Sequence, residues 1–462
     1  MTDAHAGNVI ASDAQRPLPA LLCLVALFLA LTWPAILSGR EGTSEAYDQR
    51  HYHEPVIEKI VEQWPHPDFV NYRSATTPGY HLLMATIKRY LTDSPIIVRL
   101  ISNLFSLGFL LVVFGCALRY ATPWQALMLV MPLACSTYLL AGSIWLTTDN
   151  LGWLFVSVAL GAAVMSKPTA ARFALGGIAV LAVTFVRQIH IWTAAPVALA
   201  ALLQSPLANS LPKTLRHDDH NQQQTWLPLI AAGFFIAAAF ALLGAFVLAW
   251  GGLTPPAFTE QHARGPNLAT IPLALSLVGV FGMFFLPAFG GYREAFAFRS
   301  RTVVLVAIAA AVLCMLMPTS YAFDDGRRGG PLWHIVRLLP VFADRSIVFP
   351  LLAAVGALVL LQAWRSVVAA GNRQPAMILL LGMLGWVLAQ SMNFQAWQRY
   401  CEPIILVMLI WLAALAQPHQ TERAANRAAL PQRWWIGPIA LSIVQFSLTA
   451  AGVYWPMIRD AM

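Results

Sequence analysis

The chain has 462 residues, of which 58% are hydrophobic and only 11% are charged. Ordinary soluble domains carry about 25% charged residues, so a soluble fold could not cover this much apolar surface, and lipid must be the solvent for most of the chain. The net charge of +8 does not indicate a nucleic-acid-binding protein, because much of it lies in short loops between apolar runs, where Lys and Arg set the orientation of spans.

The five cysteines form no Cys-x-x-Cys pair, and four of them lie inside apolar runs. Cysteines in that setting usually behave as small buried hydrophobic residues. We therefore expect neither a disulfide framework nor a zinc site.

Apolar runs recur along the whole chain. Residues 1–16 are polar, and the run that follows, from about Pro17 to Ser38, is long enough to be retained as a first helix. A spanning helix needs about 20 apolar residues. The candidate spans are 17–38, 95–117, 123–145, 150–166, 172–187, 190–204, 227–250, 268–289, 302–318, 346–364, 376–392, 402–417 and 435–456. The predicted fold is a single all-α domain over residues 1–462, a polytopic membrane protein with about 11–14 transmembrane helices.

The basic residues between the spans predict an orientation. With the N-terminus in the cytoplasm, arginines such as Arg119, Arg172 and Arg373 fall on the cytoplasmic side, as the positive-inside tendency requires. The polar segment 205–226 then becomes a cytoplasmic linker. The same assignment places the compact polar clusters of the chain on the outer face, where insertion does not require them.

The first outer loop, residues 39–94, is unusually rich in ionisable side chains. They include Asp48, His51, His53, Glu54, Glu58, Glu62, Asp68 and Arg73. Apolar residues between 55 and 64 recur on one helical face, which predicts a short amphipathic helix lying at the membrane surface. Residues 81–91 predict a second surface helix, and Asp48 precedes the first helix by about one turn.

Asp48 is the candidate general base. Transfer of a sugar from a phosphate needs a base to take the proton of the acceptor hydroxyl, but no strong acid, because phosphate leaves readily without protonation. One carboxylate therefore suffices, unlike the pair that glycoside hydrolases use. Two alternatives stay open: Asp48 could be a solvated residue or a helix cap, and Glu45 or Asp68 could be the base.

Asp149 and Arg187 are further candidates at the ends of spans. Asp149, in the sequence TTDN at 147–150, is either a helix N-cap or a second carboxylate that orients the acceptor or a catalytic side chain. Arg187 and Gln188 interrupt an apolar stretch, where an ionisable group usually faces a cavity or a partner. A guanidinium suits a phosphate through paired hydrogen bonds, although Arg187 could instead snorkel to the interface.

Three later outer loops carry more cations than topology alone predicts. The loop 251–267 contains His262, the loop 319–345 contains several Asp and Arg residues, and QRYCEP at 398–403 contains Arg399. Each loop alone is typical of solvated surface. Together they could bind anionic lipid headgroups non-specifically or a polyprenyl phosphate specifically.

The aromatic residues divide into two groups. Most Trp and Tyr lie at span ends and are typical of an interfacial belt. Trp64, Tyr80 and Trp397 instead lie in polar outer segments, so we consider them candidate surfaces on which a sugar could stack.

Several motifs follow one another between about residues 45 and 405. They are Tyr47-Asp48, His53-x-Pro55, TTPGY at 76–80, TTD at 147–149, VRQIHIW at 186–192, a loop with His262, FDDGRR at 323–328, WHIVR at 333–337 and QRYCEP at 398–403. This order resembles the alpha-1,2-glucosyltransferases of asparagine-linked glycosylation, and more broadly the GT-C superfamily of polyprenyl-phosphate-sugar transferases. In the first loop the chain departs from the family pattern Tyr-x-Asp-Glu: Asp48 directly follows Tyr47, Gln49 stands where an acid is expected, and His53 follows Asp48 by five residues rather than four. The loop around His262 also lacks the family's Gly-Asp start.

The resemblance implies an inverting transfer, independent of metal or cofactor, of a hexose such as glucose from a polyprenyl-phosphate donor to a lipid-linked or periplasmic glycan acceptor. The residues it implies are Asp48 and Asp149 as catalytic groups, and Arg187, Gln188, Arg399, His53, Tyr80 and His262 in binding the phosphate and sugar of the donor. High Ala and Arg usage favours a bacterial relative, hence an undecaprenyl carrier in the inner membrane and an active site on the periplasmic face.

Two other functions stay open. A transporter or flippase of lipid-linked sugars would also need many spans, although transporters place their sites near the midplane on broken helices. A polymerase or ligase of surface polysaccharide would also have outer loops rich in Arg and Asp. In each case the expected partners are lipid-linked sugars, glycans or glycolipids and membrane lipids, and not nucleic acid.

Overall fold

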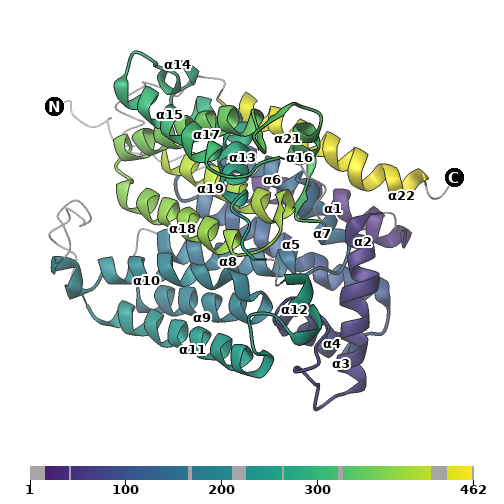
Figure 1. Ribbon diagram of the computed structural model, residues 1–462. Helices are drawn as coiled ribbons and strands as arrows, with labels where there is room; N and C mark the ends of the chain where they lie inside the picture. The colour runs from purple at the N-terminus through teal and green to yellow at the C-terminus, as the bar shows by residue number, and fades with distance from the viewer. Residues whose placement is uncertain are drawn as a thin grey trace, which may run out of the picture.

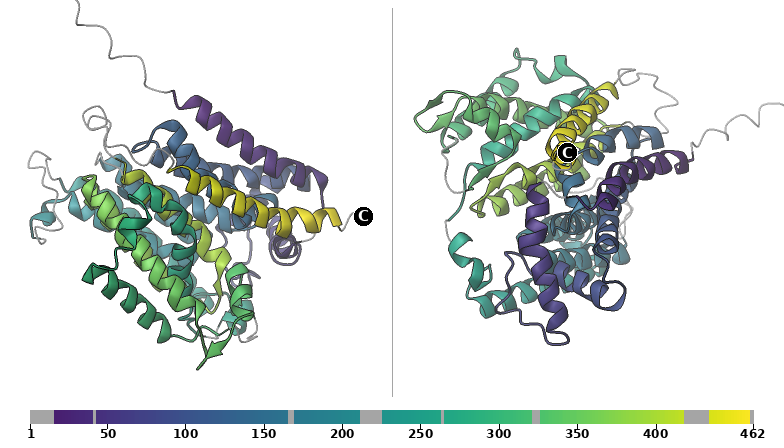
Figure 2. Two further views of the ribbon diagram at one scale, coloured as in Figure 1. Left: turned by 90° about the horizontal axis from the view of Figure 1, so that it is seen from above. Right: turned by 90° about the vertical axis from the view of Figure 1, so that its right-hand side faces the viewer.

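The computed structural model describes residues 16–40, 43–164, 169–210, 225–262, 265–320, 326–417 and 434–459. Within these ranges helices pack side by side into a bundle (Figures 1 and 2), and the strands are limited to two short pairs. Most of the predicted N-terminal segment 1–16 and of the predicted linker 205–226 lies outside the described residues.

Eight helices among the described residues are long and apolar enough to cross a membrane. They are α1 (Leu18–Ser38), α5 (Pro95–Ala117), α11 (Leu227–Trp250), α13 (Thr270–Phe285) with the turn η5 (Leu286–Phe289), α17 (Val348–Ala369), α18 (Arg373–Ser391), α19 (Gln398–Leu415) and α21 (Ile436–Thr449) continued by η6 (Ala450–Tyr454) and α22 (Trp455–Arg459).

The remaining apolar helices are shorter or broken. α6 (Pro123–Ala134) and α7 (Thr137–Ile144) meet at a bend of 72°. The short ones are α8 (Asp149–Val164), α9 (Ala170–Val186), α10 (Ala194–Leu203) with η2 (Gln188–Thr193) before it, and α15 (Arg301–Met315). Each predicted span falls on one of these helices, so the prediction of an all-α polytopic membrane protein is confirmed.

The segment after the first span is more helical than predicted. α2 (Ser44–Asp48), the π-helical turn η1 (Gln49–His53) and α3 (Glu54–Glu62) follow one another directly, so Asp48 lies inside a helical segment rather than a turn before it. The Thr43 hydroxyl caps its start by accepting the Ala46 N–H at 3.2 Å. Residues 44–53 have no apolar stripe, so hydrophobic periodicity does not reveal this helix.

Beyond residue 53 the two predicted amphipathic helices are confirmed. α3 buries Val56, Ile57 and Ile60, and α4 (Gly79–Tyr90) packs against α3 with Met84 buried in the same apolar cluster. The exposed faces of both helices carry the charged side chains, as the sequence pattern predicts.

α19 runs through the middle of the bundle, and 89% of its 18-residue window is buried. A helix that is apolar on every side belongs in such a position. The helix begins at Gln398, four residues before the predicted span start, because the polar residues of QRYCEP find partners inside the protein. Arg399 and Glu402 therefore lie in its first turns and not in a loop.

The remaining elements connect the helices. They are η3 (Pro206–Ser210), α12 (Pro256–His262), α14 (Tyr292–Ala295), α16 (Pro331–Arg337), the parallel pair β1 (Arg328–Gly329) and β4 (Ala396–Trp397), and the antiparallel pair β2 (Val341–Phe342) and β3 (Arg345–Ser346). The β1–β4 pair ties the connection before α16 to the beginning of α19.

Glycines let α13 and α17 approach each other closely. A Cβ added to Gly279 would lie 2.2 Å from the Leu352 carbonyl oxygen, and one added to Gly356 would lie 2.0 Å from the Leu275 carbonyl oxygen. Small residues at such crossings permit backbone contact between helices in membranes.

The close contact makes a prediction for stability. Gly279→Ala should lower the thermal midpoint of the protein in detergent, at a cost on the order of 1–3 kcal/mol, because the backbone of α17 would have to move. Gly385→Ala in α18 is the matched control, since a Cβ at Gly385 meets nothing within 4 Å. Equal midpoints for the two variants would contradict the packing described here.

Candidate active site

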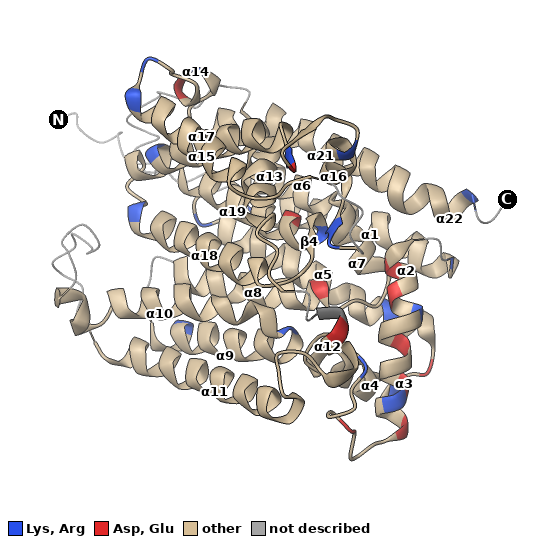
Figure 3. Ribbon diagram, in the orientation of Figure 1, with Lys and Arg blue, Asp and Glu red and all other residues tan. Residues whose placement is uncertain are grey.

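Two acids and two arginines meet at one end of the bundle. Asp48 comes from the end of α2, Asp149 begins α8, Arg187 follows α9, and Arg399 is the second residue of α19. Figures 1 and 3 show that these elements converge from distant parts of the sequence. We call this end, defined by these four residues, the site end.

The four side chains form one ion-pair network. Arg399 Nη1 donates to Asp48 Oδ2 at 2.8 Å, and Arg399 Nη2 donates to Asp149 Oδ2 at 3.3 Å. Arg187 Nη1 pairs with the other carboxylate oxygen of Asp149. Arg399 therefore bridges both acids, and Asp149 is held by both arginines.

The network is only partly open to solvent. The side chains of Arg187, Arg399 and Asp149 are 11%, 13% and 16% exposed, and that of Asp48 is 23% exposed. Charges at this depth attract each other more strongly than in water, and removing one member leaves another charge unpaired at a large cost. Pairing explains how four ionisable groups persist together here.

Gln49 positions Asp48. The Gln49 side chain is buried, and its Oε1 accepts the backbone N–H of Leu146 at 3.0 Å. This bond joins the helix that carries Asp48 to the residues that directly precede α8. Asp149 is the first residue of α8. In the sequence Gln49 is notable only because it stands where an acid is expected. Its contact with Leu146, 97 residues away, leaves no local sequence pattern that would predict a positioning role.

Asn150 positions Asp149. Its Nδ2 is bonded to Ser106 Oγ at 2.8 Å and to the Leu139 carbonyl at 3.0 Å, which fixes the beginning of α8 against α5 and α7. On the next turn, a Cβ at Gly152 would lie 3.3 Å from Arg187 Cδ. The absence of a side chain at Gly152 therefore gives Arg187 room to reach Asp149.

Glu402 and Gln398 position Arg399. The Glu402 carboxylate is buried and accepts hydrogen bonds from Ser136 Oγ at 2.6 Å and Gln398 Nε2 at 2.9 Å. Ser136 lies at the break between α6 and α7, so the bend presents its hydroxyl to the first turns of α19. Gln398 Oε1 also accepts the Leu332 N–H at 3.1 Å, which anchors α16.

Tyr400 lies between the two guanidinium groups. The Tyr400 ring centroid is 5.3 Å from Arg187 Cζ and 5.2 Å from Arg399 Cζ. Trp397 stacks on Tyr400 with ring centroids 5.8 Å apart and planes inclined by 3°. An aromatic face attracts a cation, so Tyr400 and Trp397 form a wall that keeps both arginines at the network.

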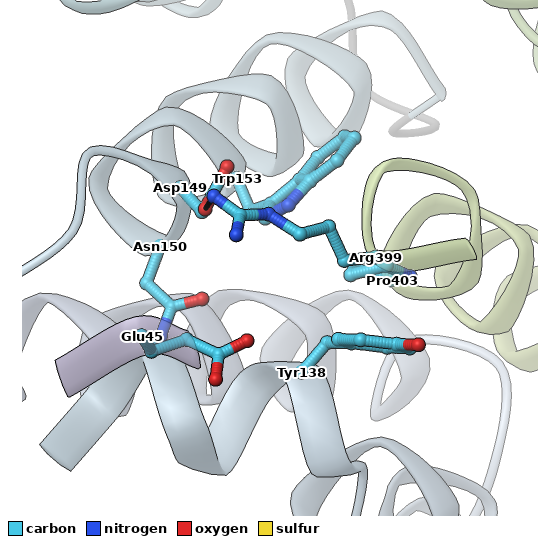
Figure 4. A pocket seen from close by; sticks show the side chains of 8 residues that line it. Glu45, Tyr138, Asp149, Asn150, Trp153, Arg399 and Pro403 are labelled. Atoms are coloured by element: carbon cyan, nitrogen blue, oxygen red, sulfur yellow. Dashed lines mark hydrogen bonds and ion pairs between the residues drawn. The ribbon is translucent and has the colours of Figure 1, made fainter. Parts of the chain in front are cut away.

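A small pocket that Arg399 and Asp149 help to line adjoins the network. Figure 4 shows Arg399 extending toward Asp149 across it, with Trp153 beside them and Glu45 and Tyr138 on the facing helices. Asp48 reaches this pocket through Arg399. Glu45 lines it directly, so Glu45 keeps its place as an alternative base.

Three buried side chains form a hydrogen-bonded chain beside the network. Tyr72 Oη bonds to His81 Nδ1, and His81 Nε2 lies 2.9 Å from His53 Nδ1. The imidazoles of His53 and His81 stack with centroids 5.1 Å apart. Burial lowers the pKa of His81 to about 3; burial, then the charges of His81, Arg399 and Arg187, hold the pKa of His53 well below its ordinary value.

The other predicted residues lie outside the ion-pair network. Gln188 bonds the Thr77 N–H at 3.0 Å and the Ala75 carbonyl at 2.9 Å, and thereby fixes the turn before α4. Tyr80 is fully buried, with its hydroxyl 2.9 Å from Ser102 Oγ, so its ring packs in the interior and offers no open face to a sugar. His262 ends α12, and its side chain lies outside the described residues.

Asp68, the second alternative to Asp48 as the base, takes no part in the network. Its carboxylate accepts the N–H groups of Val70 and Asn71 and the Asn71 side-chain amide, and the Asn71 amide is the main cause of its lowered pKa. Over the part of the chain that the structure describes, no three His, Cys, Asp or Glu side chains are grouped so as to hold a metal ion.

No family model and no curated protein matches the chain. Among solved structures it is similar to ArnT from Cupriavidus metallidurans, with 12% identity over 87% of this chain and 77% of ArnT in the apo state and a TM-score of 0.37. For the same protein bound to undecaprenyl phosphate, the identity is 12%, the coverage 94% and 88%, and the TM-score 0.38.

The chain is also similar to the archaeal oligosaccharyltransferase AglB from Archaeoglobus fulgidus, in complex with an inhibitory peptide and a dolichol-phosphate. The identity is 14% over 96% of this chain and 55% of AglB, with a TM-score of 0.44. The chain thus spans about half the length of AglB. Likeness at this level does not transfer an activity or a residue role.

The buried histidines predict acid sensitivity. Both would ionise near pH 6.5 in the unfolded chain but resist protonation when folded, so the unfolded state gains protons first as the pH falls. Stability should be highest above pH 6.5 and decline toward pH 4, by up to about 1.4 kcal/mol per pH unit for each histidine.

His81→Gln removes one of these histidines and should make the thermal midpoint less dependent on pH between 7 and 4. His51→Gln, which changes an exposed histidine nearby, is the matched control and should melt with the wild-type pH profile. Parallel profiles for the His81 variant and the wild type would show that His81 is not held neutral.

Proposed function

We propose that this protein is an inverting membrane glycosyltransferase that moves a hexose from a polyprenyl-phosphate donor to a glycan or glycolipid acceptor. The observation that carries the proposal is the ion-pair network. It joins a carboxylate, Asp48, and two guanidinium groups, Arg187 and Arg399, at the end of a transmembrane bundle, where Arg399 and Asp149 of the network line a pocket.

These groups supply what the reaction requires. The acceptor oxygen attacks the anomeric carbon as the bond from that carbon to the phosphate oxygen breaks, and the phosphate leaves with the electron pair. Asp48 takes the acceptor proton. Arg187 and Arg399 stabilise the charge that grows on the departing phosphate, and attack from the face opposite to the phosphate inverts the anomeric centre.

The network also explains how the base would be released. Before the donor binds, the carboxylates of Asp48 and Asp149 are both occupied by the guanidinium of Arg399, which donates to Asp48 Oδ2 and to Asp149 Oδ2. A donor phosphate competes with Asp48 and Asp149 for the guanidinium groups. Binding of the donor would therefore turn Arg399 toward the phosphate and free Asp48 to accept a proton.

The positions of basic residues support a periplasmic site. α9, α15 and α18 begin with or close to Arg172, Arg301 and Arg373, and each of these helices runs toward the site end. The basic starts therefore lie at the opposite end of the bundle, which the positive-inside tendency assigns to the cytoplasm. The site end then faces the periplasm of a bacterial inner membrane.

The π-helical turn supports the resemblance to alpha-1,2-glucosyltransferases. A π turn holds one more residue than an α turn through an i→i+5 hydrogen bond, here from the Glu54 N–H to the Gln49 carbonyl. It accommodates the extra residue between Asp48 and His53 without interrupting the helical segment that runs from α2 through α3. On this basis glucose is the first donor sugar to test, with undecaprenyl phosphate as the carrier.

The proposal is tested with the purified protein in proteoliposomes and a panel of radiolabelled undecaprenyl-phosphate sugars, followed by glycolipid analysis. An enzyme should move label from one donor to an acceptor, with inverted anomeric configuration in the product. Movement of intact donor across the bilayer without transfer would indicate the transporter alternative. Extension of a long glycan would indicate a polymerase or ligase.

Asp48→Asn should reduce transfer by at least about a thousandfold, because the amide cannot take the acceptor proton, while donor binding is retained. Glu45→Gln tests the rival acid in the pocket, and Asp93→Asn, at an exposed position, is the control. Full turnover by the Asp48 variant, or loss of turnover only in the Glu45 variant, would falsify the assignment of Asp48.

Arg187→Ala should weaken binding of the donor phosphate by roughly tenfold to a hundredfold, as expected when a charge-assisted contact is lost. Binding of undecaprenyl phosphate can be measured directly by tryptophan quenching. Arg89→Ala changes an exposed arginine of α4 and should bind normally. Wild-type affinity in the Arg187 variant would remove this residue from the phosphate site.

A further inference from the structure

We propose that Tyr72 and His81 are positioning residues that hold His53 as the neutral tautomer with its proton on Nε2, so that this N–H binds a hydroxyl group of the donor sugar. The inference rests on the proposed function for the identity of the ligand. The fixed tautomer itself rests only on the geometry of the three side chains.

The chain of hydrogen bonds begins at Tyr72, whose side chain is buried with 3% exposure. Burial raises the pKa of the phenol, so the hydroxyl keeps its proton. A phenol donates more strongly than it accepts, and an imidazole nitrogen is the better acceptor of the pair. The favoured arrangement has Tyr72 Oη–H donating to His81 Nδ1.

The tautomer of His81 then fixes that of His53. A neutral imidazole carries one proton, so His81 with an accepting Nδ1 must carry its proton on Nε2. That N–H points at His53 Nδ1, 2.9 Å away. His53 Nδ1 is therefore an acceptor, and the single proton of His53 lies on Nε2, at the opposite edge of the ring.

Packing keeps both rings in place. Tyr80 meets His53 and His81 edge-on, with interplanar angles of 78° and 81°, and its own hydroxyl is anchored to Ser102. The fully buried Tyr80 therefore acts behind the histidines rather than on the ligand. Neither imidazole can rotate without breaking the chain of hydrogen bonds.

The surroundings of His53 explain why a neutral donor is useful. After burial and the charge of His81, the charges of Arg399 and Arg187 lower the pKa of His53, so the ring lies within electrostatic reach of the groups assigned to the phosphate. A charged histidine would repel both arginines. A neutral N–H instead offers a directed hydrogen bond suited to an uncharged hydroxyl, such as one on the sugar next to the phosphate.

Nitrogen-15 NMR of protein labelled at histidine, in lipid bilayers at pH 7, tests the tautomer without any activity assay. The His53 signals, identified by their loss in His53→Gln, should show Nδ1 without a proton and Nε2 with one. A proton on Nδ1, or on both nitrogens, would overturn the proposal even if the enzyme proves to be a glycosyltransferase.

Tyr72→Phe removes only the hydroxyl and should release the chain of hydrogen bonds. The expected result is exchange between the two His53 tautomers, together with a rise of about tenfold in KM for the donor and little change in kcat. Tyr52→Phe, at an exposed tyrosine of the helical turn that carries His53, is the matched control. Unchanged tautomer and KM in a folded Tyr72 variant would refute the positioning role.

The NMR measurement and the transfer assay distinguish failure of the tautomer assignment from failure of the proposed function. If the sugar panel shows no transfer, the contact with a donor sugar is wrong, while the wild-type spectrum still decides whether His53 is held as one tautomer. If transfer occurs but KM is insensitive to His53→Gln, the proposed function stands and the sugar contact does not.

Discussion

The bridge that Arg399 makes between Asp48 and Asp149 is the constraint on which the site depends. It joins a helix near the start of the chain to the beginning of α8, and it does so from the first turn of the most buried helix, α19. Because the guanidinium is planar and offers two parallel N–H edges, it can satisfy both acids only if their helices are held at a fixed separation. Much of the surrounding structure serves to maintain that separation.

The side chains that maintain it are mostly uncharged or fully paired. Gln49 bonds the backbone before α8, Asn150 bonds α5 and α7, and the pair of Gln398 and Glu402 bonds the break at Ser136. In a membrane protein each of these polar groups would be costly if left without a partner. Their hydrogen bonds therefore stabilise one arrangement of the helices, and this arrangement sets the distances between the charged groups of the network.

Hydrophobicity made the fold predictable, because runs of about 20 apolar residues have few alternatives to a spanning helix. Against this apolar background Asp48, Asp149, Arg187 and Arg399 stand out, because membrane insertion does not require ionisable residues at these positions. The pairing among them could not be predicted, since their partners are distant in sequence and no local pattern encodes the contact. The sequence does not predict the helix over residues 44–53, because that segment lacks an apolar stripe. It also predicts an exposed Tyr80, because the neighbouring residues in the sequence are polar, whereas the packing of α4 buries the side chain.

The π turn at Gln49–His53 has a consequence for how such a site can change over time. Each residue added to or removed from an α-helix rotates everything after it by about 100°, which would normally carry His53 and α3 away from the arginines. A wider turn absorbs one residue locally and leaves both flanking helices in register. The chain can therefore differ in length by one residue at this turn while α2 and α3 keep their places on either side of it.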